Sequence, residues 1–221
     1  MDKIYISPDE ENIFFLDCTR VNGKNKIISR RKESLDEQIK RLGTIFREKE
    51  IMIADDVVFS GTVLKTIIDR LEQYDVKVVG IITSITSREG YDKFNEKLKY
   101  GLKANFIMDN DVIDQVCERD FYFGVAGSGI MVEKEEGYLK APYFYPYVSP
   151  NERASIPIEY ERYFSKGCLE RNIYFWEDID KRREKSTLIK ELPEEIIYTE
   201  KDEEVVKTLK KEIRRIWNNY K

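Results

Sequence analysis

The chain has 221 residues, of which 41% are hydrophobic and 36% are charged. This composition supplies the core of one large domain, or of one domain with an appendage, beneath a highly charged surface. The formal charge of -4 argues against bulk binding of nucleic acid or of an anionic membrane surface. The sequence contains no histidine, which excludes histidine general bases, Ser-His-Asp triads and His-ligated metal sites.

The three cysteines, Cys18, Cys117 and Cys168, are far apart and form no C-x-x-C pair. This pattern is typical of thiols in a reducing compartment rather than of a zinc site or a redox pair. No signal peptide is recognisable, and no apolar run approaches the roughly 20 residues that a membrane-spanning helix needs. We therefore expect a cytoplasmic protein that does not enter the membrane.

The first half of the chain begins with two short strands, expected at Lys3–Ser7 and Ile13–Asp17. A polar stretch over residues 20–31 contains the turn signal Asn22-Gly23. A capping box at Ser34–Glu37 then predicts a helix to about residue 48.

From Ile51 onward, strand and helix patterns alternate. Strands are expected at Ile51–Ala54, Val76–Thr83, Ala104–Met108 and Phe121–Val125, and helices over residues 63–71, 91–102 and 111–118. This alternation predicts an α/β fold with a mainly parallel sheet, flanked by helices on both faces.

Beyond residue 127 the alternation loosens. A hairpin turn is expected at Glu133–Gly137, a helix–strand pair at Ile158–Arg171 and Asn172–Trp176, and a charged helix over residues 201–220. We expect an α/β domain over residues 1–185 and a C-terminal helical tail over residues 186–221, which packs against the domain or a second subunit. The aromatic loop 138–157 is interpreted either as a hood that stacks a base or as a cover for an edge of the core.

The stretch Ile51–Val63 carries the clearest chemical pattern. A buried strand leads into two adjacent carboxylates, Asp55 and Asp56, and then into a small-residue turn at the head of a helix. Ligands of α/β proteins bind at the carboxyl ends of parallel strands, and amides at a helix N-terminus suit phosphate. Two acids beside a phosphate cradle suit a ribose 5-phosphate. The residues alone leave open the alternative of an acidic loop that caps a helix.

This stretch resembles the phosphoribosyl pyrophosphate motif of the type I phosphoribosyltransferases. The resemblance implies that Asp55 and Asp56 hold the ribose hydroxyls. It further implies that Mg²⁺ is carried on the pyrophosphate and ribose oxygens with no direct protein ligand, contact with Asp55 and Asp56 being an open alternative. It also implies a 5′-phosphate site, which would be formed by Phe59, Ser60, Gly61, Thr62 and Val63. The segment Arg119–Val125 resembles the strand that carries a base-stacking aromatic, which places Phe121, with Tyr122 beside it, against the base.

The sequence also departs from the family pattern at several positions. Phe59 stands where the family usually has Thr or an acid, and Val63 where a phosphate-binding Ser/Thr is usual. Ser84, in the base-contacting position, replaces the Lys that reads a 6-oxo group, which argues against hypoxanthine or guanine as the acceptor. Upstream, neither Ile4–Asp9 nor Phe14–Arg20 shows the small-residue turn of a pyrophosphate loop. The basic stretch 19–31 is interpreted either as a mobile loop that covers pyrophosphate or as an exposed charged hairpin.

Three functions follow, in order of preference. The first is an enzyme that transfers phosphoribosyl from phosphoribosyl pyrophosphate to an unidentified base or other acceptor. The second is a non-catalytic member that senses this ligand or a nucleotide, or that binds a partner protein; a homodimer is an open alternative. The third is a phosphohydrolase, which is disfavoured because neighbouring residues leaving a strand point in different directions, whereas that chemistry uses Asp-x-Asp.

Overall fold

The computed structural model describes residues 3–7, 13–24, 26–109, 117–135, 137–152, 156–198 and 200–218. The chain divides into two compact units, Met1–Gln115 and Val116–Lys221. The boundary expected at residue 185 lies inside the second unit, where helices from both of its sides pack together. Each unit is described by itself.

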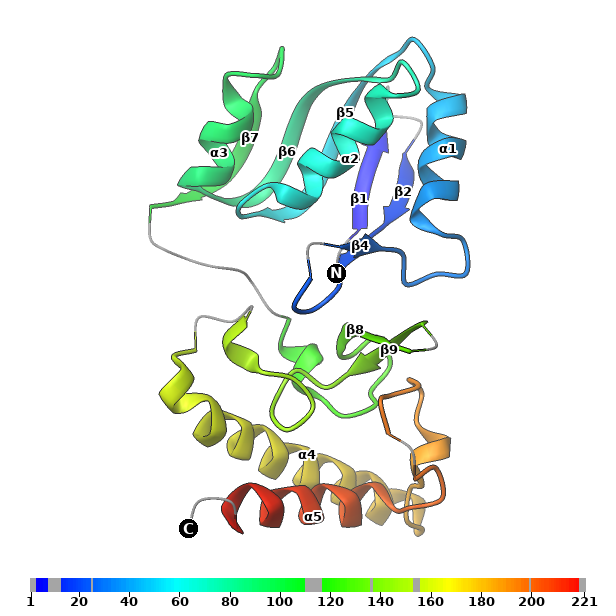
Figure 1. Cartoon of the computed structure of the whole chain (residues 1–221), viewed down its shortest axis with the longest axis vertical. Helices are drawn as coiled ribbons and strands as arrows, with labels where there is room; N and C mark the ends of the chain where they lie inside the picture. Colours follow the sequence, from blue (N-terminus) through cyan, green and yellow to red (C-terminus); the bar gives the residue numbers. More distant parts are fainter. Residues whose placement is uncertain are drawn as a thin grey trace. The chain divides into compact units, whose positions relative to one another are not determined.

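The first unit is built on a five-stranded sheet (Figure 1). Its strands lie in the order β2-β1-β5-β6-β7. They are β1 (Lys3–Ser7), β2 (Phe14–Asp17), β5 (Glu50–Val58), β6 (Lys77–Ser87) and β7 (Leu102–Met108). The β5-β6 and β6-β7 pairs are parallel, while β1 is antiparallel to both of its neighbours. The strands β2, β5, β6 and β7 therefore all point the same way, which confirms an α/β fold with a parallel sheet.

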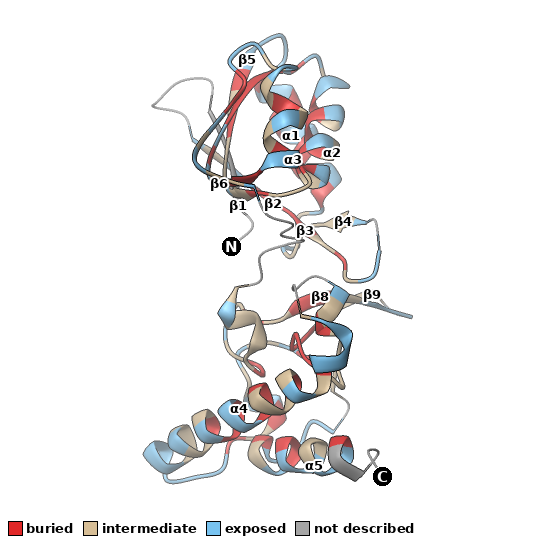
Figure 2. Ribbon diagram, turned by 90° about the vertical axis from the view of Figure 1, so that its left-hand side faces the viewer, coloured by how far each residue is buried: buried red, intermediate tan, exposed pale blue. Residues whose placement is uncertain are grey.

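Three helices cover one face of this sheet: α1 (Leu35–Ile45), α2 (Thr62–Glu72) and α3 (Arg88–Asn95), as Figure 2 shows. Coverage of both faces by helices was expected, but within the described residues the helices lie on one face. From β2 onward the chain advances in one direction along the sheet, to β5, β6 and then β7. Right-handed crossovers that all advance in one direction place their helices on one side. Ile81 is buried in the core beneath the helices, whereas its neighbour Ile82, on the other face, is exposed.

A small hairpin follows β2 and is formed by β3 (Thr19–Arg20) and β4 (Ile27–Ile28). It coincides with the basic stretch 19–31, and so agrees with the charged-hairpin interpretation. The capping box is present at the start of α1, where Ser34 and Glu37 each bond to the other's backbone amide.

The second unit has a two-stranded hairpin and two helices. The hairpin is β8 (Ile130–Lys134) and β9 (Gly137–Ala141), in agreement with the predicted turn. The helices α4 (Glu161–Arg183) and α5 (Val205–Asn218) pack together over a core of their own. Short 3₁₀ turns complete the described part, at Glu118–Phe121, Pro150–Glu152, Ile158–Tyr160 and Ile189–Glu191.

The strand predicted at Asn172–Trp176 is wrong, because these residues lie inside α4. The run is rich in aromatic and β-branched residues, which favour strands. The helical period nevertheless continues through it, since Cys168, Leu169, Asn172, Ile173 and Trp176 are all buried at helical spacing.

The strand predicted at Phe121–Val125 is also wrong. A 3₁₀ turn occupies Glu118–Phe121, and bends and turns follow it. Side chains of α4 replace the ladder that a strand would need: Asn172 accepts from the Phe123 amide (2.6 Å) and donates to the Phe121 carbonyl (2.9 Å), and the Trp176 indole donates to the Phe123 carbonyl (3.0 Å). Backbone groups satisfied in this way need no neighbouring strand. Most of the helix predicted over 111–118 lies outside the described residues.

No helix among the described residues is both long enough and apolar enough to cross a membrane.

Candidate active site

The acid pair lies within β5 rather than after it. The strand continues past Ala54 to Val58, because Val57 and Val58 pair with Ile85 and Thr86 of β6. Asp55 is half-buried and Asp56 is exposed. The carboxylate of Asp55 accepts from the Asp56 amide, and that of Asp56 accepts from the Val57 amide, each at 3.0 Å.

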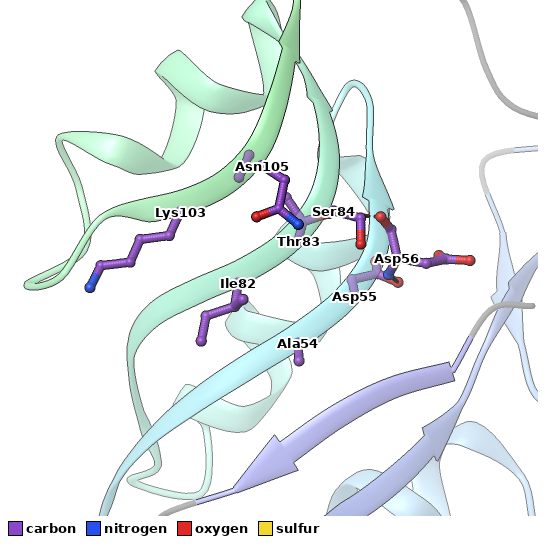
Figure 3. A pocket seen from close by; sticks show the side chains of 9 residues that line it. Ala54, Asp55, Asp56, Ile82, Thr83, Ser84, Lys103 and Asn105 are labelled. Carbon is purple, nitrogen blue, oxygen red and sulfur yellow. Dashed lines mark hydrogen bonds between the residues drawn. The ribbon is translucent and has the colours of Figure 1, made fainter.

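A shallow hollow adjoins the acid pair on the sheet. It has a volume of about 380 Å³ and is formed by consecutive positions of three parallel strands. The lining residues are Ala54, Asp55, Asp56, Ile82, Thr83, Ser84, Lys103, Ala104 and Asn105. Figure 3 shows Ser84 close to the acid pair, whereas Lys103 extends away from it. The floor is therefore partly apolar, with carboxylate, hydroxyl and amide groups at one end.

The turn between β5 and α2 has the geometry of an anion cradle. Gly61 is the N-cap of α2 and has φ +66°. A Cβ there would lie 2.4 Å from Cε2 of Phe94, so glycine is required for both conformation and space. Gly61 has no side chain to cap the first amides of α2, and amides at a helix start attract anions. The hydroxyls of Ser60 and Thr62 lie 3.0 Å apart beside them.

The N-cap residue and a lysine of α3 donate hydrogen bonds to the backbone of this turn, a contact that the sequence did not indicate. The hydroxyl of Ser87, the N-cap of α3, donates to the Phe59 carbonyl (3.0 Å), and the ammonium of Lys93 donates to the Ser60 carbonyl (2.6 Å). Gly90 lies so close that a Cβ would be 2.1 Å from the Phe59 carbonyl oxygen. Val63, predicted in the phosphate site, packs its side chain against the core, so only its backbone is available to a ligand.

The predicted site residues divide between the two units. Asp55, Asp56 and Ser84 line one hollow, and Phe59–Val63 follows directly after β5 and leads into α2. Phe121 and Tyr122 belong to the second unit. There the Phe121 ring stacks on Tyr143 (5.7 Å between centroids) and also meets Phe164, while Tyr122 meets Phe175.

In the aromatic loop 138–157, Tyr143 and Phe144 are fully buried in the second unit. These two rings therefore belong to the interior of that unit, as the alternative interpretation of this loop proposed.

The hairpin after β2 begins at the same edge of the sheet as the acid pair, because β2 and β5 point the same way. Its base is held by Asp17, which is 4% exposed and binds the Arg30 side chain (2.8 Å), the Arg30 amide (2.7 Å) and the Ser29 hydroxyl (3.1 Å). Burial acts to raise the pKa of Asp17, but the bonds and charge of Arg30 outweigh burial and hold it below the ordinary value of 3.8. Arg30 is therefore committed to the hairpin's base.

Comparison with known families agrees with this geometry. Residues 10–121 match the phosphoribosyl transferase domain, which is half of the chain and most of the first unit. The chain belongs to this family, and its α/β unit has the type I phosphoribosyltransferase fold. Membership connects the protein with phosphoribosyl transfer in general and with a small ligand of the phosphoribosyl pyrophosphate type. No curated protein and no solved structure gives a significant match.

Proposed function

We propose that the first unit binds phosphoribosyl pyrophosphate and transfers its phosphoribosyl group to a base or another acceptor. One observation carries the proposal: in a unit that matches the family, β5 supplies the two carboxylates and leads straight into the uncapped start of α2. The spacing suits a ligand that carries both ribose hydroxyls and a 5′-phosphate.

In the proposed reaction, the bond between C1′ and the pyrophosphate oxygen breaks, and its electron pair leaves with pyrophosphate. The acceptor's lone pair then forms the new bond to C1′, and the acceptor loses a proton. Asp55 and Asp56 would fix the ribose hydroxyls, and their negative charge would favour the cationic character that develops at C1′. The turn Phe59–Val63 would anchor the 5′-phosphate, so that binding energy remote from C1′ orients the reacting centre.

The donor set of the acid pair fits magnesium. Carboxylate oxygens are the ligands that Mg²⁺ prefers, and it is usually held by one or two carboxylates together with substrate phosphates. Among the described residues, no group of three or more acidic or cysteine side chains is placed to hold a metal by itself. Asp55 and Asp56 would therefore contact an ion that pyrophosphate carries, and the ion would neutralise charge on the leaving group.

The experiment is calorimetric titration of phosphoribosyl pyrophosphate with Mg²⁺ into wild type and into the double variant Asp55→Asn/Asp56→Asn. We expect the variant to lose most of the binding. Neutral side-chain amides cannot both accept the hydrogen bonds of the two ribose hydroxyls and contact the magnesium ion. Asp69→Asn, at an exposed position on α2, is the matched control and should bind as wild type does. Unchanged affinity in the double variant would falsify the assignment.

A second candidate is a non-catalytic member that binds the same ligand as a sensor. Two observations favour it: Phe59 and Val63 replace the usual polar residues, and Arg30 is engaged by Asp17 instead of being available for pyrophosphate. Labelled phosphoribosyl pyrophosphate, incubated with Mg²⁺ and a panel of bases, separates the two. Binding without release of pyrophosphate supports the sensor, and base-dependent release supports the transferase.

For Ser84 of the first unit, we propose contact with the acceptor base. For Phe121 and Tyr122 of the second unit, the separate proposal is that an aromatic ring stacks a base. Phe121→Leu should raise the KM for the acceptor if its ring stacks a base. It should lower only stability if the ring serves the contacts with Tyr143 and Phe164.

Assembly and location complete the proposal. A second copy of the chain or a partner protein would supply the groups that the pyrophosphate site lacks. Light scattering at defined concentrations measures the mass of the protein in solution and so tests for the homodimer. Cys117 and Cys168 carry free thiols, which suits the proposed cytoplasmic location.

A further inference from the structure

The turn Phe59–Val63, proposed above to hold the 5′-phosphate, is called the phosphate turn below. Two of its backbone carbonyls face α3 and accept hydrogen bonds from side chains there. Ser87 donates to the carbonyl of Phe59, and Lys93 donates to the carbonyl of Ser60. These contacts join positions 28 and 33 residues apart in the sequence. The Lys93 stem also runs along the turn, with its Cδ 3.3 Å from where a Cβ of Gly61 would lie.

The direction of each carbonyl fixes the direction of the following amide. In a trans peptide the C=O and N–H of one plane point in opposite directions, and among the described residues the one cis bond is Tyr145–Pro146. A Ser60 carbonyl held toward α3 therefore turns the Gly61 amide away from α3. The Phe59 carbonyl does the same for the Ser60 amide. These are two of the amides at the head of α2 that a phosphate would use.

The Ser60–Gly61 plane needs such a constraint. Glycine adopts positive and negative φ with similar ease, so the plane before and after Gly61 can rotate at low cost. A rotated Ser60–Gly61 plane would present a carbonyl oxygen to the phosphate and repel it. A charge-assisted bond is about twice as strong as a neutral one. A cation on the carbonyl also polarises the peptide and makes its N–H a better donor.

We propose that Lys93 is a positioning residue for the 5′-phosphate, acting through the Ser60–Gly61 peptide. Its ammonium holds the Ser60 carbonyl, orients and polarises the Gly61 amide, and so keeps the cradle ready before the ligand arrives. This inference rests on the proposed function and adds a residue outside the stretch Ile51–Val63. The Ser87 bond to Phe59 is the neutral counterpart on the preceding peptide.

The test compares Lys93→Met with Lys93→Arg, which keeps a cationic donor, and with Lys97→Met, which removes an exposed lysine from the turn after α3. Ribose 5-phosphate is titrated into each protein by calorimetry, and the Gly61 amide is followed by NMR in ¹⁵N-labelled protein. We expect Lys93→Met to bind ribose 5-phosphate about tenfold more weakly, from loss of one charge-assisted bond. The change in chemical shift of the Gly61 amide on ligand binding should also be smaller in this variant than in wild type. Lys93→Arg should recover most of the affinity, and Lys97→Met should match wild type.

The outcomes separate this inference from the function on which it rests. Wild type that binds neither ribose 5-phosphate nor phosphoribosyl pyrophosphate overturns the proposed function, and the role of Lys93 with it. Wild-type binding together with unchanged affinity and an unchanged Gly61 shift in Lys93→Met overturns the role of Lys93 alone. A loss of affinity that Lys93→Arg does not restore, with the Gly61 shift unchanged, shows a merely structural lysine and also overturns it. If Lys93→Met does not fold, Lys93→Gln, which keeps a neutral donor, carries the same comparison.

Discussion

Replacement of Gly90 by alanine tests the contact between α3 and the phosphate turn most directly. A Cβ at this position would lie 2.1 Å from the Phe59 carbonyl oxygen, 2.9 Å from the Val58 carbonyl oxygen and 3.0 Å from the Thr86 hydroxyl. The two closest obstacles are backbone atoms, which cannot rotate away as the end of a side chain can. The turn itself must therefore move, by about 1 Å to reach ordinary contact.

The expected magnitude is a balance of two effects. Alanine in a helix gains up to about 1 kcal/mol over glycine, whereas overpacking of a well-packed site costs about 1–3 kcal/mol. We expect a net loss of about 1–2 kcal/mol in the unfolding free energy of the first unit. Affinity for ribose 5-phosphate should also fall, because the displaced Phe59 carbonyl shifts the amides beyond it.

Urea denaturation followed by far-UV circular dichroism measures the stability, and calorimetric titration measures the affinity. Gly167→Ala is the matched control: it is also a helical glycine, but the nearest atom to its added Cβ is an Arg171 nitrogen 3.9 Å away. That substitution should stabilise the second unit by about 0.5–1 kcal/mol and leave affinity unchanged. If Gly90→Ala behaved like Gly167→Ala, the close approach of α3 to the turn would be refuted.

Further predictions concern the hairpin base and the thiols. Because the pKa of Asp17 is lowered on folding, its carboxylate stabilises the fold above about pH 4, and this contribution is lost as pH falls through the lowered value. Asp17→Asn should therefore be less stable near neutral pH but should show a flatter acid limb in urea midpoints; an equally steep limb would contradict the assignment. Arg30→Met, which leaves a buried carboxylate without its cation, should cost about 3 kcal/mol in urea denaturation, and a loss below about 0.5 kcal/mol would show that the pair contributes no more than a surface ion pair. Burial raises the pKa of Cys168 to about 11, so in native alkylation followed by mass spectrometry the partly exposed Cys117 should react well before it; earlier labelling of Cys168 would oppose this order.

The fold of the first unit was largely predictable because its signals are local. The capping box at Ser34, the apolar run from Ile51 and the turn at Gly61 each lie within a few residues of the element that they define. The pattern of the acid pair followed by the turn Phe59–Val63 is visible in the sequence for the same reason. The end of β5 is not, since Asp55 and Asp56 remain in the strand only through its pairing with β6.

The features that sequence reasoning missed depend on distant partners. Lys93 meets Ser60 across 33 residues, and no periodicity in α3 marks it as different from the other lysines nearby. The segment after Glu118 has the composition of a strand but obtains its hydrogen bonds from Asn172 and Trp176, about 50 positions later. Such pairings are set by tertiary packing, which a local pattern does not encode.

The division into two units, each with its own core, has a practical consequence for how ligand binding is observed. Both tryptophans of the chain, Trp176 and Trp217, belong to the second unit, whereas the acid pair and the phosphate turn belong to the first. Selectively excited tryptophan emission therefore originates entirely outside the unit proposed to hold the phosphoribosyl ligand. A titration in which tryptophan fluorescence does not change would therefore not show that the ligand fails to bind. A Phe59→Trp or Phe94→Trp substitution would give the first unit an optical reporter of its own.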